Sequence, residues 1–153
     1  AIRYLEGLGR EVPAGPHRRV YVSRNLGARR RLTNESDLLP LFTARGYHMV
    51  SPETLSLVEQ ISMFKGAQIV AGNLGAGLAN LVFSPAGVTV LALTTPRMAH
   101  DYFYDIVCHK GGHYRGLQGI STDPQPDIGS DYSVDPAMVT AGLDWAELAC
   151  GDD

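Results

Sequence analysis

The chain alternates between two kinds of apolar pattern. Short, nearly continuous apolar runs rich in β-branched and aromatic residues predict strands, and stretches in which apolar residues recur every three or four positions predict helices. The short runs lie at residues 18–24, 47–50, 67–72 and 87–93, and the less apolar stretch 113–121 is a further candidate for a last strand. The run at 87–93 is almost entirely apolar, so we expect this strand to be buried on both faces.

The helical stretches begin and end at recognisable signals. After a short helix at residues 2–8 and a proline- and glycine-rich linker at 11–17, helices are predicted at 34–46, 53–66, 76–83, 97–111 and 135–148. Asn34 and Asp135 stand where helix caps are expected, with acidic Glu35 in the first turn after Asn34. Ser51 precedes Pro52, which suits the first position of a helix. These signals separate helices that alternate with the strands.

Strands that alternate with helices predict an α/β fold. We expect a three-layer, Rossmann-like, mostly parallel sheet with helices on both faces. The length of 153 residues suits one domain, and no internal repeat or low-complexity tract divides it. We therefore expect residues 1–153 to form a single domain. Because the sequence begins at Ala1 rather than at a methionine, we also expect a fragment of a longer protein.

Composition and charge narrow the class of protein. A hydrophobic content of 44% and a charged content of 19% are typical of globular domains. The net charge of -3 argues against a nucleic-acid-binding protein, which is usually basic. No apolar run is long enough to cross a membrane, and no signal-peptide pattern opens the chain. Two cysteines, Cys108 and Cys150, make no disulfide framework, so we expect a reducing compartment such as the cytoplasm.

Arginine supplies most of the positive charge, because Lys65 and Lys110 are the only lysines. The guanidinium group suits bidentate contacts with phosphate or carboxylate. A bias in the composition of the genome explains the same preference equally well. Arg30 belongs to the run 29–31, which is either a solvated loop or a loop that brings one arginine to a phosphate.

Polar and small residues follow the predicted strands. In a parallel sheet, ligands bind outside the carboxyl ends of the strands. Those ends are Ser23 and Arg24, Ser51 and Pro52, the glycine stretch that contains Gly75 and Gly77, and Thr94 to Pro96. Free amides between Gly75 and Asn80, in front of a helix, predict an anion site with Arg24 as its cation. The alternative is that Gly75, Ala76 and Gly77 serve close packing of a helix on the sheet.

Motifs for other ligands are incomplete. "GAGLAN" resembles the dinucleotide fingerprint, but Asn80 stands in place of its third small residue, and no acid follows the next strand until Asp101. An oxidoreductase is therefore disfavoured, and no GK[ST] motif indicates a nucleoside-triphosphate loop. "CHKGGH" carries Cys108, His109 and His113 at a spacing that matches no usual zinc site, so we expect no metal.

The helix predicted at 53–66 carries two polar candidates. Leu57, Ile61 and Phe64 form its apolar face, and Gln60 falls beside them, so Gln60 needs a hydrogen-bond partner if it is buried. Glu59 lies on the flank, where it either accepts hydrogen bonds from ribose hydroxyls, binds an arginine, or makes a structural hydrogen bond. Elsewhere, Asn34 and Glu35 are explained by capping or by a supporting role in which they orient an arginine.

Four pieces follow one another in order between residues 18 and 93. They are a strand ending in Ser23-Arg24, the pattern R-x-x-x-N-E at Arg30 to Glu35, "LSLVEQISMF", and "GAGLANLVF" followed by a proline-glycine region and an apolar strand. Their order and spacing resemble the carboxyl-terminal half of glycosyltransferase family 61, which includes bacterial capsular-polysaccharide enzymes and eukaryotic xylosyl- and N-acetylglucosaminyltransferases. The later "DYSVDPAMVTAGL" resembles the tail of bacterial members.

The resemblance implies one half of a GT-B architecture, in which two Rossmann-like domains face a cleft. This chain would be the donor-binding domain, without the amino-terminal domain. The implied reaction transfers a sugar from a nucleotide-sugar to a hydroxyl of a saccharide acceptor, with inversion and without a metal or other cofactor. The implied setting is surface or capsular polysaccharide synthesis in the bacterial cytoplasm, at the inner face of the membrane. An inverting enzyme needs a general base, which we expect in the absent domain, so no catalytic residue is assigned.

The resemblance also implies which residues bind the donor. Arg24 and the amides of the glycine turn would hold the diphosphate and stabilise the charge that grows on it as the sugar leaves. The implied donor-binding set is Ser23, Arg24, Arg30, Asn73, Gly75, Ala76, Gly77 and Asn80, supported by Asn34, Glu35, Glu59 and Gln60.

Leu74 departs from the family pattern. The family commonly has a histidine immediately before Gly-Ala-Gly, and a histidine there could contact the phosphate or the acceptor. The departure keeps open a second interpretation, a non-catalytic domain that binds a nucleotide or a phosphosugar. Asn73 is the adjacent residue that could take over the contact.

Overall fold

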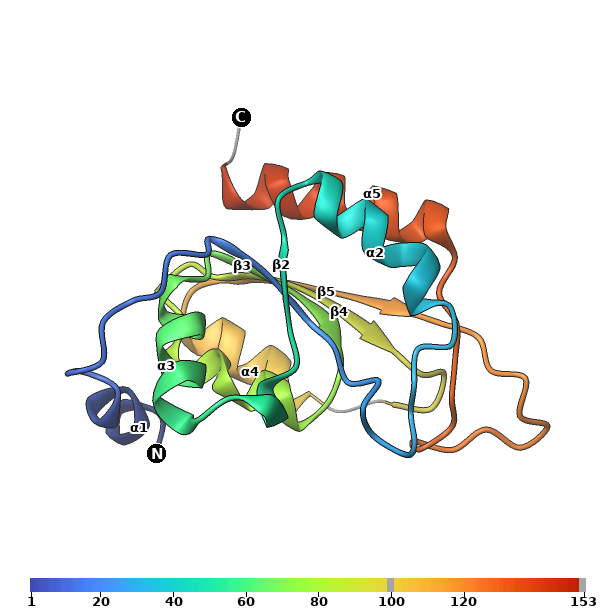
Figure 1. The fold of residues 1–153 in the computed structure, drawn as a ribbon, viewed down its shortest axis with the longest axis horizontal. Helices are drawn as coiled ribbons and strands as arrows, with labels where there is room; N and C mark the ends of the chain where they lie inside the picture. The colour runs from blue at the N-terminus through green and yellow to red at the C-terminus, as the bar shows by residue number, and fades with distance from the viewer. Residues whose placement is uncertain (99–100, 152–153) are drawn as a thin grey trace.

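The computed structural model of the protein describes residues 1–98 and 101–151. Its centre is a five-stranded, entirely parallel sheet in the order β2-β1-β3-β4-β5 (Figure 1). The strands are β1 (Arg19–Val22), β2 (His48–Val50), β3 (Ile69–Asn73), β4 (Thr89–Thr94) and β5 (His113–Gln118). The sheet confirms the predicted α/β class, and β4 is buried along nearly its whole length, as its apolar run predicts.

Helices cover both faces of the sheet, which confirms the three-layer prediction. On one face lie α2 (Glu35–Ala44) and α5 (Pro136–Cys150) (Figure 1). On the other lie α3 (Leu57–Gly66), the 3₁₀ helix η2 (Ala76–Phe83) and α4 (Tyr102–His109), with α1 (Ile2–Leu8) beside η2. A short 3₁₀ turn, η1 (Pro52–Thr54), follows β2. Each face of the sheet therefore has its own apolar core.

The order of the strands reverses between β1 and β3. From β1 the chain crosses one face through α2 to the outer strand β2, and it then returns over the other face through α3 to β3. Such a reversal opens a crevice at the carboxyl ends of the two central strands, where doubly wound sheets bind their ligands. Because the strands are parallel, the predicted strand ends after β1 to β4 all lie at this one edge.

The helix predicted at 53–66 is interrupted. Its first part forms only η1, and α3 begins after Ser56, whose hydroxyl accepts a hydrogen bond from Glu59 N (3.3 Å) while the Glu59 carboxylate accepts one from Ser56 N (2.8 Å). This capping box satisfies free amides and so fixes the start of α3. Leu57 is 65% exposed and does not belong to the predicted apolar face, whereas Ile61 and Phe64 are buried.

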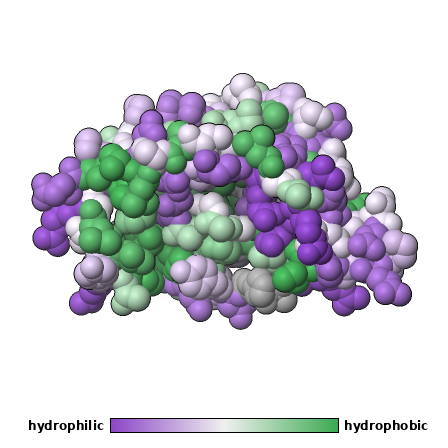
Figure 2. Space-filling view, turned by 60° about the horizontal axis from the view of Figure 1, so that its bottom comes forward, coloured by the Kyte–Doolittle hydropathy of each residue, from purple (hydrophilic) through white to green (hydrophobic). Residues whose placement is uncertain are grey.

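In Figure 2, apolar side chains gather near the end of the molecule where α1 and α3 lie.

Asn34 stands at the N-terminal end of α2, but its side chain does not cap that helix. Its Nδ2 donates to the Val134 carbonyl (2.8 Å), and Val134 N donates to its Oδ1 (3.2 Å). The amide is therefore used to join the start of α2 to the segment that leads into α5. Asp135 caps α5 as predicted, because its carboxylate accepts a hydrogen bond from Ala137 N (2.8 Å).

Two other helices differ from their predictions. The segment 76–83 is a 3₁₀ helix rather than an α-helix. The sequence pattern does not separate the two types over so short a span, because residues three apart meet in both. The helix predicted at 97–111 is α4, which begins at Tyr102, and residues 99–100 of that range lie outside the described residues.

Candidate functional site

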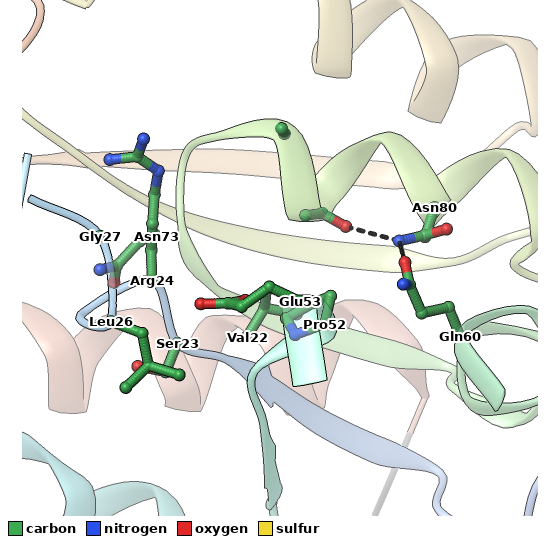
Figure 3. A pocket seen from close by; sticks show the side chains of 12 residues that line it. Val22, Ser23, Arg24, Leu26, Gly27, Pro52, Glu53, Gln60, Asn73 and Asn80 are labelled. Atoms are coloured by element: carbon green, nitrogen blue, oxygen red, sulfur yellow. Dashed lines mark hydrogen bonds between the residues drawn. The ribbon is translucent and has the colours of Figure 1, made fainter. Parts of the chain in front are cut away.

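A cavity of about 460 Å³ opens at the carboxyl edge of the sheet, over the ends of β2, β1 and β3 (Figure 3). The residues that line it are Val22, Ser23, Arg24, Leu26, Gly27, Pro52, Glu53, Gln60, Asn73, Ala76, Gly77 and Asn80. The structure thus brings together every predicted donor-binding residue except Arg30 and Gly75. Of the predicted supporting residues, it brings only Gln60 to the cavity.

Arg24 extends from the end of β1 along the turn between β3 and η2 (Figure 3). A Cβ atom added to Gly75 would lie 2.7 Å from Arg24 Nε and 2.8 Å from its Cδ, so only a glycine leaves room for the arginine here. Arg24 Nη1 also donates to the Arg29 carbonyl (2.7 Å), which orients the guanidinium group. The guanidinium is therefore held against the turn that carries the free amides.

Arg30 reaches the same turn from the loop after β1. Its backbone adopts a positive φ of 57°, and its Nη1 donates to the Leu74 carbonyl (3.1 Å) and lies 3.0 Å from Met98 Sδ. Asn25 closes this loop by exchanging two hydrogen bonds with the Leu32 backbone, each 2.9 Å long. Burial, followed by the nearby Arg24 charge, lowers the pKa of Arg30. Its Nε is buried and has no hydrogen-bond partner among the described residues.

The four arginines of this loop divide into two kinds. Arg29 pairs with Asp127 (3.1 Å) and Arg31 with Asp131 (2.8 Å), so their charges are compensated on the outside of the molecule. Within residues 1–98 and 101–151, no carboxylate pairs with Arg24 or Arg30. Two uncompensated cations therefore meet at the Leu74–Gly75 turn, next to the cavity. Such a place favours an anion.

A buried polar network lies beneath the cavity. The Tyr21 hydroxyl donates to Glu35 Oε1 (2.8 Å) and lies 3.3 Å from Asn73 Oδ1, and Ser23 Oγ donates to Glu35 Oε2 (3.1 Å). Burial and then the Glu35 carboxylate raise the pKa of Tyr21 far above its usual range. Glu35 thus holds two cavity residues, Ser23 directly and Asn73 through Tyr21, and contacts no arginine among the described residues.

Gln60 and Asn80 form a hydrogen-bonded pair on the opposite wall (Figure 3). Asn80 Nδ2 donates to Gln60 Oε1 (2.8 Å) and to the Gly77 carbonyl (3.2 Å), and Gln60 Nε2 donates to the Leu55 carbonyl (3.1 Å). Gln60 therefore has the partner that its half-buried position requires. The pair also joins α3 to the first turn of η2.

Glu53 is a cavity residue that the sequence reasoning missed, and Glu59 is a predicted one that lies elsewhere. The Glu53 side chain extends into the cavity from η1 (Figure 3), whereas Glu59 is engaged in the α3 capping box and lines a different surface hollow. The position of Glu53 in the turn that follows β2, next to the predicted rim residues Ser51 and Pro52, was the available signal, because strand ends form the rim. Leu26 and Gly27, from the loop after β1, were also missed.

The glycines between Gly72 and Gly77 have two functions: they allow close packing, and they leave room for the Arg24 side chain. A Cβ atom on Gly77 would lie 3.2 Å from Pro52 Cγ and from Val22 Cγ1. A Cβ atom on Gly72, in β3 itself, would lie 2.2 Å from the Val22 carbonyl oxygen, and Gly72 has a φ of 147°. Gly72 and Gly77 therefore bring β3 and η2 close to β1, and Gly75 makes room for Arg24.

Leu74 is an apolar core residue in this structure. Its side chain is 2% exposed and belongs to the core beneath α3, η2 and α4. Only its carbonyl takes part in the site, as the acceptor for Arg30. Asn73, next to it, points to the other face of the sheet and into the polar network rather than into the position of the Leu74 side chain.

The described residues contain no group of three or more histidine, cysteine or acidic side chains placed to share a metal ion. Among the same residues, no helix is both long enough and apolar enough to cross a bilayer.

A doubly wound parallel sheet with a basic, glycine-lined cavity at its switch point defines a Rossmann-like α/β domain. The sequence profile of glycosyltransferase family 61 matches residues 6–91, which is more than half of the chain and includes every residue that lines the cavity. The chain therefore belongs to glycosyltransferase family 61, a family of transferase enzymes. A comparison with curated proteins finds no match.

Proposed function

We propose that this chain is the donor-binding domain of a glycosyltransferase whose donor is a nucleotide-sugar. The observation that carries the proposal is the pair Arg24 and Arg30 at the Leu74–Gly75 turn, with no carboxylate partner among the described residues. A diphosphate supplies the charge that this pair lacks, and guanidinium groups bind phosphate oxygens in bidentate fashion. The amides at the start of η2 add uncharged donors at the same place.

The nucleoside lies in the 460 Å³ cavity in this proposal. Glu53, at the carboxyl end of β2, accepts hydrogen bonds from the ribose hydroxyls, and Pro52 and Leu26 provide apolar surface for the base. In this proposal Glu53 makes the ribose contact for which Glu59 was the candidate from the sequence. A cavity of this size falls within the range of small-molecule sites, roughly 300–1,000 Å³.

The reaction follows from these positions. An acceptor hydroxyl of a saccharide attacks the anomeric carbon, the bond from that carbon to the diphosphate oxygen breaks, and the configuration inverts. The nucleoside diphosphate leaves with an added negative charge, which Arg24 and Arg30 stabilise more strongly than they stabilise the intact donor. A general base of a second, amino-terminal domain in a GT-B arrangement takes the proton of the hydroxyl. No metal is required, and surface or capsular polysaccharide in a bacterium is the proposed product.

A second candidate is a domain that binds a nucleotide or phosphosugar without transferring it. Leu74 favours this candidate, because its side chain is buried in the core and brings no titratable group to the turn. Release of free nucleoside diphosphate from a donor in the presence of an acceptor separates the two when it is measured on the protein together with the domain that carries the general base: the first candidate requires this release, and the second excludes it.

The test is calorimetric titration of the intact chain with UDP, GDP and, as a control, NAD. We expect saturable binding of one nucleoside diphosphate, weakened about ten- to a hundredfold by Arg24→Ala, because hydrogen bonds to charged groups contribute roughly 1.5–3 kcal/mol. Arg29→Ala is the matched control, since Asp127 already compensates that arginine, and it should change the affinity less than about twofold. Preference for NAD, or an Arg24→Ala variant that binds as well as the original chain, contradicts the proposal.

A further inference from the structure

A second cavity lies at the same edge of the sheet, on the other side of β3. Its volume is about 340 Å³. The residues that line it are Leu74, Thr94, Pro96, Met98, Asp101, Tyr114, Gly116 and Gln118. The first cavity lies over β2, β1 and β3, and this one lies over the ends of β4 and β5 beyond the Leu74–Gly75 turn.

Arg30 connects the two cavities. Its guanidinium touches the Leu74 carbonyl and Met98 Sδ, and both of these residues line the second cavity. Arg24, at the edge of the first cavity, is near enough for its charge to help burial lower the pKa of Arg30. A ligand bound on the two arginines therefore has a cavity on each side of it.

The lining of the second cavity combines hydrogen-bonding groups with apolar surface. The Asp101 carboxylate makes no hydrogen bond or ion pair with any described residue, although it stands at the N-terminal end of α4. Tyr114 is partly buried beside it, and burial followed by the Asp101 charge raises the pKa of its phenol. A carboxylate without a cation among the described lining residues disfavours an anion and favours a neutral ligand that donates hydrogen bonds.

We propose that the second cavity binds the sugar ring that is transferred, with Asp101 accepting hydrogen bonds from its hydroxyls. A sugar offers donors to a carboxylate and apolar C–H faces to Pro96 and Met98. This inference rests on the proposed function, because the diphosphate on Arg24 and Arg30 is what joins the nucleoside in the first cavity to the sugar in the second. Asp101 is accordingly a residue that determines sugar specificity.

The test compares each nucleoside diphosphate with its sugar conjugates on the intact chain: UDP with UDP-glucose, UDP-xylose and UDP-N-acetylglucosamine, and GDP with GDP-mannose. We expect one conjugate to bind more tightly than its parent diphosphate. Asp101→Asn should weaken that conjugate about tenfold and change the affinity for the diphosphate less than about twofold. Asp105→Asn is the matched control, because Asp105 lies in the first turn of α4 and is exposed like Asp101 but does not line the cavity, and it should alter neither affinity.

The outcomes separate this inference from the proposed function. If the original chain binds a diphosphate but Asp101→Asn leaves the advantage of the conjugate intact, the sugar is not in this cavity and the proposed function stands. If Asp101→Asn weakens the binding of the diphosphate and of its sugar conjugate equally, Asp101 does not contact the sugar and this inference is wrong. If free methyl xyloside or N-acetylglucosamine binds to the UDP-loaded chain and Asp101→Asn abolishes only that binding, the cavity takes the acceptor and our assignment is wrong. If no nucleoside diphosphate binds, both proposals fail.

Discussion

Gly75 serves both functions that the sequence allows for the glycine turn, namely close packing and access for a ligand. Its φ of 175° is an extended conformation open to any residue, so the backbone does not require glycine. The requirement comes from the space above it, where Arg24 Nε and Cδ occupy the position of a Cβ atom. Packing and ligand access are therefore the same property here, because the group packed on the glycine is the cation offered to the ligand.

Gly75→Ala should weaken nucleoside diphosphate binding about tenfold while leaving the free energy of unfolding within about 0.5 kcal/mol of the original value. The new Cβ meets only the flexible end of Arg24, so the side chain moves away from the turn while the fold remains. Calorimetry gives the affinity, and urea unfolding gives the stability. Gly7→Ala, where a Cβ meets nothing within 4 Å, is the control that should keep full affinity. Unchanged affinity in Gly75→Ala would show that the ligand does not need Arg24 on this turn.

The junction between η1 and α3 shows local hydrogen bonds overriding a longer helical pattern. Residues 53–66 read as one helix, but the exchange between Ser56 and Glu59 starts α3 afresh. The break has a consequence for the site. It leaves Glu53 on η1 at the rim of the cavity, and it places Glu59 on the far side, in the capping box.

The two glutamates should therefore respond oppositely to substitution. Ser56→Ala and Glu59→Ala should lower the free energy of unfolding by about 0.5–2 kcal/mol, the usual effect of losing an N-cap, and leave nucleotide affinity unchanged. Glu53→Ala should weaken UDP or GDP binding several-fold and leave the unfolding midpoint in urea unchanged, since Glu53 is exposed. If Glu59→Ala lost nucleotide affinity without losing stability, Glu59 rather than Glu53 would be the residue that contacts the ribose.

Elements with strong local signals were predictable from the sequence. The central strands β3 and β4 carry dense apolar runs, and Asp135 before Pro136 marks the start of α5 as the structure has it. The start of α3 was missed because the Ser56–Glu59 box competes with the earlier Ser51–Pro52 signal, and sequence spacing does not rank the two. The type of η2 was missed for a similar reason, since its pattern fits either helix.

Partners far apart in the chain were not predictable. From the sequence, Glu35 is an acid in the first turn of α2. In the structure it is buried and accepts hydrogen bonds from Tyr21 in β1 and from Ser23, the residue that follows β1. Asn34 reads as a cap, yet its amide pairs with Val134, one hundred positions later. These contacts depend on the strand order and on where α5 lies, which a single sequence does not specify. The sequence predicts Arg24 and the glycine turn in one anion site, but only the fold shows that the Arg24 side chain lies directly on Gly75.

The charge of the molecule is unevenly distributed. The whole chain carries -3, so its average field repels a diphosphate. Of the arginines in the loop after β1, Arg29 and Arg31 are paired with aspartates of the segment 123–131, which leaves Arg24 and Arg30 as a local positive site on an acidic molecule. An anion is therefore attracted to this edge of the sheet because Arg24 and Arg30 are not compensated there, and not because of the net charge of the molecule.

A nucleoside diphosphate bound at this edge should stabilise the whole fold in a salt-dependent way. At a ligand concentration of about one hundred times Kd, linkage gives about 2.7 kcal/mol, and for a domain of this size that corresponds to a rise in Tm of roughly 5–10 °C. At a fixed ligand concentration, raising KCl from about 0.05 M to 0.5 M should reduce the rise, because Arg24 and Arg30 are partly exposed and their contacts with phosphate are screened as the Debye length shortens to a few ångströms. Differential scanning calorimetry measures both effects, with Arg24→Ala expected to lose most of the rise and Arg29→Ala to keep it. A rise that is insensitive to salt and persists in Arg24→Ala would mean that the ligand binds somewhere other than the two uncompensated arginines.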